Sequence, residues 1–385
     1  MRTIARSMLV AAAFAFSQSG QSSERARDLG IPFDGVTGAL NAITDVAGVA
    51  VGQVSIIEDL PDDRAVRTGV TAVLPRGAKS SGEPVFAGWF SLNGNGEMTG
   101  TTWIEESGFL EGPVMITNTH SVGTVHQATI DWRVSQGQAD GSGYWWSLPV
   151  VAETWDGHLN DINGFHVKAE HVHAALRSAS GGPVAEGNVG GGTGMICHEF
   201  KCGIGSSSRI AETAGSTYTV GVLVQANYGL RSTLRIAGVP VGQHLTEDRA
   251  YASLPQPVSE TGSIIVVVAT DAPLLPHQLK RIAKRASLGI ARVGGMAGNG
   301  SGDIFVAFST AGSEMDKEGS LMVVHMLSND AISPLFDATV LATEEAIVNA
   351  MVAATDMKGD RGHVAKGIDH AQLRKVLRQY NRLGK

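Results

Sequence analysis

The feature that most constrains the fold is an uninterrupted apolar run past the middle of the chain. Residues 264–270 read Ile-Ile-Val-Val-Val-Ala-Thr, without polar alternation. A strand with one solvated face alternates polar and apolar residues, so a continuous β-branched run predicts a strand buried on both faces. Such a strand requires packed layers above and below it, and therefore a large sheet-based core.

The other periodic segments fall into groups of strands and groups of helices. By apolar patterning and turn residues we expect further strands at 47–57, 69–75, 112–118, 218–227 and 304–309. We expect helices at 124–136, 166–178, 278–286, 338–354 and 369–382. Because the elements do not alternate strictly, an α/β sandwich with sheets inside and helices outside is favoured over a doubly wound parallel sheet.

Two irregular segments separate these elements. The glycine-dense run 187–194 lacks the Gly-Lys-Ser/Thr ending of a phosphate-binding loop, so we interpret it as a packing loop. Residues 238–260 are polar, carry three prolines and show no period, which makes them the best linker candidate.

Composition excludes several classes of protein. Of the 385 residues 43% are hydrophobic and 17% charged, which is typical of a globular chain of one or two domains. The net charge of −7 is scattered and leaves no basic stripe for phosphates, so nucleic acid is not expected as a partner. After the N-terminus no stretch is apolar enough for a membrane anchor.

The N-terminus has the pattern of an export signal. Arg2 and Arg6 precede an apolar run, 8–16, that is too short to span a bilayer. We therefore predict that residues 1–24 are a signal peptide with a flexible tail and that the protein is periplasmic or secreted. A frayed N-terminal helix would give a similar pattern.

Cysteines and histidines give little support for a metal. Cys197 and Cys202 are the only cysteines, so they form either one small disulfide loop or two free buried thiols. The closest histidine pair, His171 and His173, is not part of a His-Glu-x-x-His motif, and positions two apart on a helix point in different directions. We expect neither a metal nor another cofactor.

Ser263 is the first candidate nucleophile. It joins the irregular segment to the buried strand and follows Gly262, whose conformational freedom would allow a strained peptide bond. Attack of the hydroxyl on the Gly262 carbonyl, followed by hydrolysis, would leave Ser263 with a free α-amino group of near-neutral pKa. An ordinary turn before a strand would have the same sequence.

Other residues could assist such a nucleophile. Ser301 and Asp303 lie in Gly-Asn-Gly-Ser-Gly-Asp, where they could tune it by hydrogen bonding or simply form a capped turn. The serine is displaced by one position from a Gly-x-Ser-x-Gly elbow, so a lipase-like triad is not supported. Asn227 could donate to an oxyanion or form a turn. Glu153 and Trp155 could bind a substrate ammonium or form an amphipathic strand edge.

Four segments together resemble a known family. They are Leu40–Val49, Ser91–Gly100, Gly187–Met195 and Ala269–Leu274. In this order they are similar to the self-processing serine aminopeptidases that include L-aminopeptidase/D-Ala-esterase-amidases and β-peptidyl aminopeptidases. The similarity extends from Arg25 nearly to the C-terminus.

The resemblance implies a four-layer αββα sandwich akin to N-terminal-nucleophile hydrolases with a different connectivity. It implies cleavage at Gly262–Ser263 into a larger chain, 25–262, and a smaller chain, 263–385, which stay associated. The family's nucleophile falls on Ser263. Its other site residues fall as follows: the accompanying serine and carboxylate on Ser301 and Asp303, the oxyanion asparagine on Asn227 and the ammonium-binding glutamate on Glu153.

Two positions depart from the family pattern. Trp155 stands where a tyrosine is expected, so a hydroxyl there would be lost. Asp303 stands where some β-peptide-cleaving members have glutamate, which shortens the reach by one methylene.

We therefore expect an aminopeptidase that acts on a small peptide, amide or ester with a free N-terminal amine through an acyl-enzyme on Ser263. The resemblance also implies a homo-oligomer, a tetramer of processed heterodimers. Alternatives are an acyltransferase of the ornithine-acetyltransferase type and a periplasmic binding protein that keeps the fold without cleaving. The sequence does not distinguish α- from β-amino acid substrates or their stereochemistry.

Overall fold

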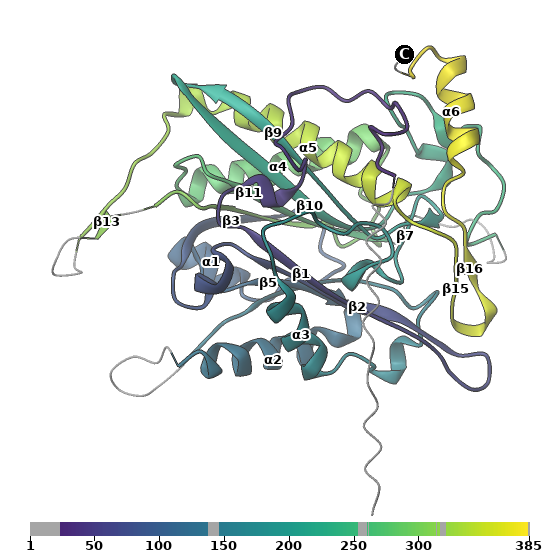
Figure 1. The fold of residues 1–385 in the computed structure, drawn as a ribbon, viewed down its shortest axis with the longest axis horizontal. Helices are drawn as coiled ribbons and strands as arrows, with labels where there is room; N and C mark the ends of the chain where they lie inside the picture. The colour runs from purple at the N-terminus through teal and green to yellow at the C-terminus, as the bar shows by residue number, and fades with distance from the viewer. Residues whose placement is uncertain are drawn as a thin grey trace, which may run out of the picture.

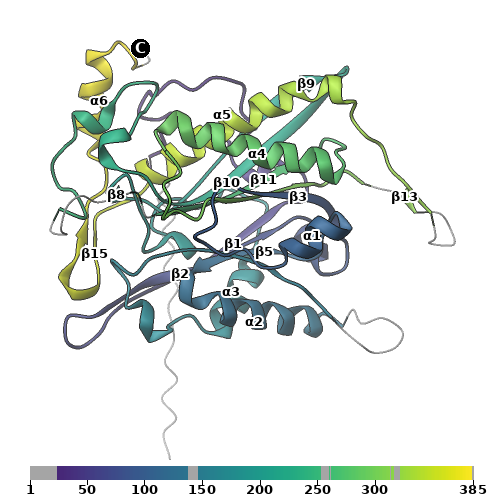
Figure 2. The same cartoon turned by 180° about the vertical axis from the view of Figure 1, so that it is seen from behind.

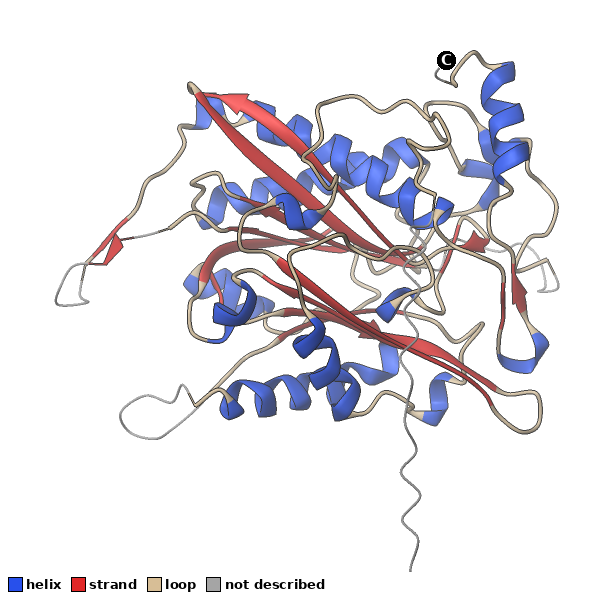
Figure 3. Cartoon of the chain, viewed as in Figure 1, coloured by secondary structure: helices blue, strands red, loops and turns tan. Residues whose placement is uncertain are grey.

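The protein is a layered sandwich of two sheets between two helical layers (Figure 1). The computed structural model describes residues 24–137, 146–252, 260, 262–312, 314–315 and 321–383. One helical layer, α4 and α5, covers a six-stranded sheet, and α2 and α3 cover a four-stranded sheet on the opposite side (Figures 1 and 3). The expected α/β sandwich is confirmed.

The larger sheet has the order β4-β3-β12-β11-β10-β9. Its strands are β3 (Val85–Ser91), β4 (Phe109–Leu110), β9 (Ile204–Thr213), β10 (Ser216–Asn227), β11 (Ser263–Thr270) and β12 (Ile304–Ser309). Strand β11 lies in the interior, antiparallel to β10 and parallel to β12. Helix α4 (Pro276–Val293) connects the two parallel strands and packs with α5 (Ser333–Val352) on the outer face.

The smaller sheet has the order β1-β2-β5-β6. Its strands are β1 (Ala50–Asp59), β2 (Ala65–Leu74), β5 (Val114–Asn118) and β6 (Val150–Thr154). Helices α2 (Val122–Ser135) and α3 (Ala169–Ser178) pack against its outer face, as the view from behind also shows (Figure 2). Helix α1 (Thr101–Ser107) lies beside β3.

Short elements lie at the ends of the sandwich. They are β7 (Ile196–Cys197), β8 (Phe200–Lys201), β13 (Glu314–Met315), β14 (Met322–Val323), β15 (Met357–Lys358), β16 (Val364–Ala365) and α6 (His370–Gln379). Each pair of strands forms its own two-stranded sheet. None of the described helices is long and apolar enough to cross a membrane.

Strand β11 is buried along its whole length, as its continuous apolar run predicts. Ile264, Val266 and Val268 pack toward α4 and α5, whereas Ile265 and Val267 enter the core between the sheets. Since strand side chains alternate, Ser263 faces the space between the two sheets. The same alternation directs Asn227 on β10 into that space.

Most predicted elements form, with shifted boundaries. Helix α4 continues well past residue 286 to Val293. Gly289 within it allows the close approach of Thr343 on α5, where a Cβ would lie only 2.5 Å from the threonine Cβ. Helix α3 begins at Ala169 rather than at 166. Strand β9 and helix α1 were not expected from the sequence.

Two irregular segments have different outcomes. Residues 187–194 are a packing loop, as predicted, whose short helix at Gly190–Gly192 is buried against both sheets. Residues 238–252 are not a free linker, because the buried guanidinium of Arg231 donates to the carbonyls of Leu245 and Glu247. Residues 253–259 and the predicted signal segment up to residue 23 lie outside the described residues.

Candidate active site

Ser263 is the first residue of β11 and stands directly opposite Asn227 of β10. Its side chain is buried, and its Oγ accepts a hydrogen bond from the backbone N–H of Gly302 at 3.1 Å. The hydroxyl therefore lies between the end of β10 and the turn that precedes β12. This turn carries Ser301 and Asp303.

The backbone of β10 passes so close to Gly262 that no other residue fits at this position. A Cβ at this position would lie 2.0 Å from the carbonyl oxygen of Asn227 and 2.6 Å from the Cα of Tyr228. Heavy atoms cannot approach so closely, so only glycine fits. The backbone at Gly262 thus packs closely against the end of β10.

The side-chain amide of Asn227 is held at both ends. Its Oδ1 accepts from the N–H of Ile196 at 2.9 Å, and its Nδ2 donates to the carbonyl of Trp155 at 2.9 Å. The contact with Ile196 fixes which end of the amide carries the donors. Because Nδ2 has two hydrogens, one remains to stabilise an oxyanion formed beside Ser263.

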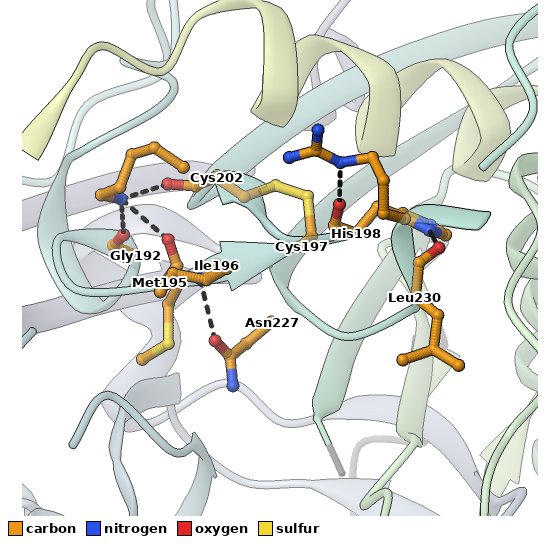
Figure 4. The surroundings of a disulfide bond; sticks show 10 residues. Gly192, Met195, Ile196, Cys197, His198, Cys202, Asn227 and Leu230 are labelled. Atoms are coloured by element: carbon orange, nitrogen blue, oxygen red, sulfur yellow. Dashed lines mark hydrogen bonds between the residues drawn. A yellow bond between two sulfur atoms is a disulfide. The ribbon is translucent and has the colours of Figure 1, made fainter. Parts of the chain in front are cut away.

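The hairpin of β7 and β8 supports this amide (Figure 4). Cys197 and Cys202 form a disulfide across it, which decides between the two alternatives left open by the sequence. The fully buried Lys201 donates through Nζ to the carbonyls of Met195 and Cys202. Burial lowers the pKa of Lys201 well below its usual value. The hairpin is thereby tied down next to Ile196.

Ser301 and Asp303 form the opposite side of the site. The hydroxyl of Ser301 donates to Asp303 Oδ1 at 2.6 Å, and Asn93 Oδ1 accepts from the N–H of Asp303 at 2.7 Å. Both side chains are buried. Burial is the main reason why the pKa of Asp303 rises to about 6.

Glu153 lies at the edge of this constellation. Its carboxylate accepts from the N–H of Glu97 at 2.9 Å and from the hydroxyl of Thr119. A Cβ on Gly96 would lie 3.0 Å from the Cα of Gly302 and 3.3 Å from Glu153 Oε1, so Gly96 separates the carboxylate from the Ser263 turn by one small residue. Burial raises the pKa of Glu153, a cost that a bound ammonium would offset.

Trp155 does not share the environment of Glu153. Its side chain is 44% exposed while that of Glu153 is almost fully buried, because β6 ends at Thr154. Trp155 instead contributes its backbone carbonyl, which positions Asn227. In the structure its indole lies against Gly157.

Thus the fold brings Ser263, Asn227, Ser301 and Asp303 together and places Glu153 next to them. Sequence reasoning missed Lys201, because nothing in the local pattern marks a lysine as buried. Among the described residues, no group of three or more His, Cys, Asp or Glu side chains is arranged to hold a metal ion.

Comparison with known proteins identifies the family. Residues 41–365 match peptidase family S58. The chain belongs to this family. It is therefore a peptide hydrolase, as the sequence resemblance predicted.

The relatives cover nearly the whole chain. The β-peptidyl aminopeptidase BapA of Sphingosinicella microcystinivorans is 54% identical over 93% of this chain and 93% of its own. The L-aminopeptidase D-Ala-esterase/amidase of Ochrobactrum anthropi, described as a variant of the Ntn hydrolase fold, has a TM-score of 0.87 at 52% identity and covers 94% of this chain and 99% of its own. A Burkholderia β-aminopeptidase has a TM-score of 0.83 at 50% identity, covering 92% and 99%. These likenesses confirm the Ntn-like fold class.

Proposed function

We propose that this S58 peptidase is a serine aminopeptidase that cleaves its own chain between Gly262 and Ser263 and then uses Ser263 as the nucleophile. The observation that carries the proposal is the position of Ser263 Oγ, held by the N–H of Gly302 between the amide of Asn227 and the Ser301–Asp303 pair. This places a hydroxyl, an oxyanion donor and a titratable carboxyl around one point.

Self-cleavage would begin with attack of Ser263 Oγ on the carbonyl carbon of Gly262. The C–N bond breaks as the ester forms, and the hydroxyl proton ends on the departing nitrogen of Ser263. Water then hydrolyses the ester, which releases the Gly262 carboxylate and restores the hydroxyl. The close packing of Gly262 against Asn227 and Tyr228, which leaves no room for a Cβ, supports this step because it holds the backbone in place at the proposed cleavage point.

Peptide hydrolysis would reuse the same groups. The substrate's ammonium binds near Glu153, and Ser263 attacks the carbonyl to form an acyl-enzyme that water resolves. The free N–H of Asn227 stabilises the oxyanion, and the new α-amino group of Ser263 accepts the hydroxyl proton. Ser301 and Asp303 tune both groups of Ser263 by hydrogen bonding.

Substrate class follows the names of the relatives. Two of the three are β-aminopeptidases and one is an L-aminopeptidase D-Ala-esterase/amidase. We propose short peptides, amides or esters with a free amino terminus, with α- and β-amino acids both to be tested. Export, from the N-terminal pattern, and assembly as a tetramer, from the family resemblance, complete the proposal.

The test is intact-mass spectrometry with N-terminal sequencing of the purified protein. We expect a fragment that begins Ser-Ile-Ile-Val and a larger partner that ends at Gly262. Ser263→Ala should remain in one piece and hydrolyse no aminoacyl amide. An uncut Ser263→Ala chain with full activity would contradict the proposed mechanism. A parent chain that stays uncut would favour a binding protein instead of an enzyme. Acyl transfer to an added amine in preference to water would indicate an acyltransferase.

A further inference from the structure

The two halves of the proposed substrate site belong to different sheets. Glu153, proposed to bind the ammonium group, is on β6 of the smaller sheet. Ser263 and Asn227, proposed to act on the carbonyl group, are on β11 and β10 of the larger sheet. Strand β6 packs against both of these strands. The spacing of the two sheets at this point therefore sets the distance between the substrate's amine and its carbonyl.

Gln225 joins the two sheets at this point. It lies on β10 two residues before Asn227, so both side chains face the space between the sheets. Its fully buried side chain donates through Nε2 to the carbonyl of Thr117 on β5 at 2.9 Å and to the hydroxyl of Thr154 on β6 at 2.8 Å. Both hydrogens of the amide nitrogen are thus bonded to the smaller sheet.

The amide of Gln225 is held in one orientation among apolar neighbours such as Leu223 and Ile265. Its Oε1 has no hydrogen bond of ordinary geometry among the described residues, and a Cβ on Gly191 would lie only 2.2 Å from it. If the amide turned over, Oε1 would face the carbonyl of Thr117, and neither oxygen could donate. This arrangement carries the cost of a buried unpaired oxygen, which an apolar side chain would avoid.

Thr154 connects Gln225 to the residues proposed to act on the substrate. It directly follows Glu153 on β6 and directly precedes Trp155. The carbonyl of Trp155 accepts from Asn227 Nδ2. The bond from Gln225 to Thr154 therefore holds the end of β6 at the point where the carboxylate on one side and the oxyanion amide on the other are positioned.

The hydroxyl of Thr154 is also joined to the β7–β8 hairpin. It donates to Met195 Sδ at 2.9 Å, and the next residue, Ile196, donates through its N–H to Asn227 Oδ1. Figure 4 shows Met195 and Ile196 beside Asn227. The hydroxyl that accepts from Gln225 thus contacts the same hairpin that orients the oxyanion amide.

The spacing of the two half-sites matters because α- and β-amino acids differ in the corresponding distance. One carbon separates the amine nitrogen from the carbonyl carbon in an α-aminoacyl group, and two carbons separate them in a β-aminoacyl group. The second carbon lengthens the extended separation by roughly 1.3 Å. A misplacement of about 1 Å can lower a rate about a hundredfold. A site with halves held at a fixed spacing should therefore favour one class of substrate.

We propose that Gln225 is a specificity-determining residue, which fixes the spacing between Glu153 and Ser263 by joining β10 to β5 and β6, and thereby selects between α- and β-amino acid substrates. This inference rests on the proposed function. Because its side chain is fully buried and both its donors are engaged, Gln225 acts through its neighbours as a positioning residue.

The experiment compares two isomeric substrates on the mature, cut protein. L-Alanyl and β-alanyl 4-nitroanilide have the same atoms and the same leaving group, and they differ only in the position of the amine. The ratio of their kcat/KM values, measured in one sample, does not depend on how much of the protein is folded or cut. We expect the parent to favour one isomer by roughly tenfold or more. Gln225→Met, which keeps the side-chain length but has no donor, should move the ratio toward one by roughly tenfold.

Two changes at Thr154 test the same link from β6, including the case in which Gln225→Met does not fold. Thr154→Val keeps the shape of the side chain but removes the hydroxyl, and it should move the ratio in the same direction. Thr154→Ser keeps the hydroxyl and should keep the ratio of the parent. Gln127→Met, at an exposed glutamine of α2, is the matched control and should also keep it.

The outcomes separate this inference from the proposed function. If Gln225→Met and Thr154→Val lose activity toward both isomers equally, so that the ratio stays within about threefold of the parent's, Gln225 is only a packing residue and Ser263 remains the nucleophile. A ratio that moves further from one, or a parent that hydrolyses both isomers with equal kcat/KM, would also overturn the inference. A parent that hydrolyses neither isomer would remove the proposed function together with it.

Discussion

The two sides of Ser263 are built in opposite ways. On the β10 side, both ends of the Asn227 amide are hydrogen bonded, and a disulfide and a buried lysine brace the hairpin behind it. On the β12 side, the buried Oδ2 of Asp303 has no hydrogen bond of ordinary geometry among the described residues. The first arrangement suits a hydrogen-bond donor that must stay fixed during the reaction. The second suits a group that exchanges a proton during the reaction.

The strongest way to test the fixed side is to remove its donor. Asn227→Ala should lower the kcat of the cleaved enzyme by about a hundredfold to a thousandfold, with little change in KM, because an oxyanion donor acts mainly in the transition state. Steady-state kinetics on an aminoacyl amide measures this. Asn163→Ala, an exposed asparagine, serves as control. An unchanged kcat would remove the oxyanion role.

The protonation of Asp303, on the β12 side, should make the stability of the protein depend on pH. The pKa of Asp303 is raised from 3.8 to about 6 in the folded chain, so the folded state holds this proton more tightly than the unfolded state does. The stability it contributes is complete below about pH 4 and is lost as the pH rises through about 6. In uncut Ser263→Ala protein, Asp303 should contribute a loss on the order of 2–3 kcal/mol from pH 4 to pH 7, and this contribution should be missing in Asp303→Asn.

Urea unfolding at several pH values, with and without Asp303→Asn, measures the difference between the two chains. Asp337→Asn on α5, an exposed acid, provides the matched control and should leave the pH dependence intact. A constant difference across this range would mean that Asp303 keeps an ordinary carboxyl pKa and that the contrast between the two sides is wrong.

The smallest expected effect on stability comes from removing the disulfide of the β7–β8 hairpin. The disulfide joins residues only 5 apart, and closing so short a loop stabilises by about 2 kcal/mol. The double change Cys197→Ser and Cys202→Ser should lower the free energy of unfolding by that amount and reduce kcat more than it alters KM. Denaturation of the parent with and without reductant gives an independent measure. Identical unfolding midpoints with and without reductant would show that the hydrogen bonds of Lys201 hold the hairpin in place without the disulfide.

The sequence predicted the centre of the fold because the centre is simple. The run at 264–270 is short, almost entirely apolar and rich in β-branched residues, which favours a strand buried on both faces. Strand β9 was missed because Ser206, Ser207 and Ser208 look exposed in sequence. In the structure all three are buried, and their hydroxyls donate to groups on neighbouring elements.

The site was predicted from the family resemblance more than from chemistry. Gly262–Ser263 alone is an ordinary turn, and no local pattern distinguishes Asn227 from other turn asparagines. Neither source drew attention to Lys201, since its significance depends on burial beside the hairpin that positions Asn227, which only the packed structure reveals. Trp155 was expected to face the ligand through its ring, yet the described contact with Asn227 is through its backbone.

The position of β11 has a consequence for the lifetime of the molecule. The proposed cut falls at the start of a strand that lies between β10 of the larger piece and β12 of the smaller one. Both pieces would thus share one sheet and one core, and neither would hold a complete core alone. Once the cut protein has unfolded, the larger and smaller pieces must meet by diffusion before they can fold again. Its durability would then be governed by the height of the unfolding barrier rather than by an equilibrium, so each cut molecule would fold only once.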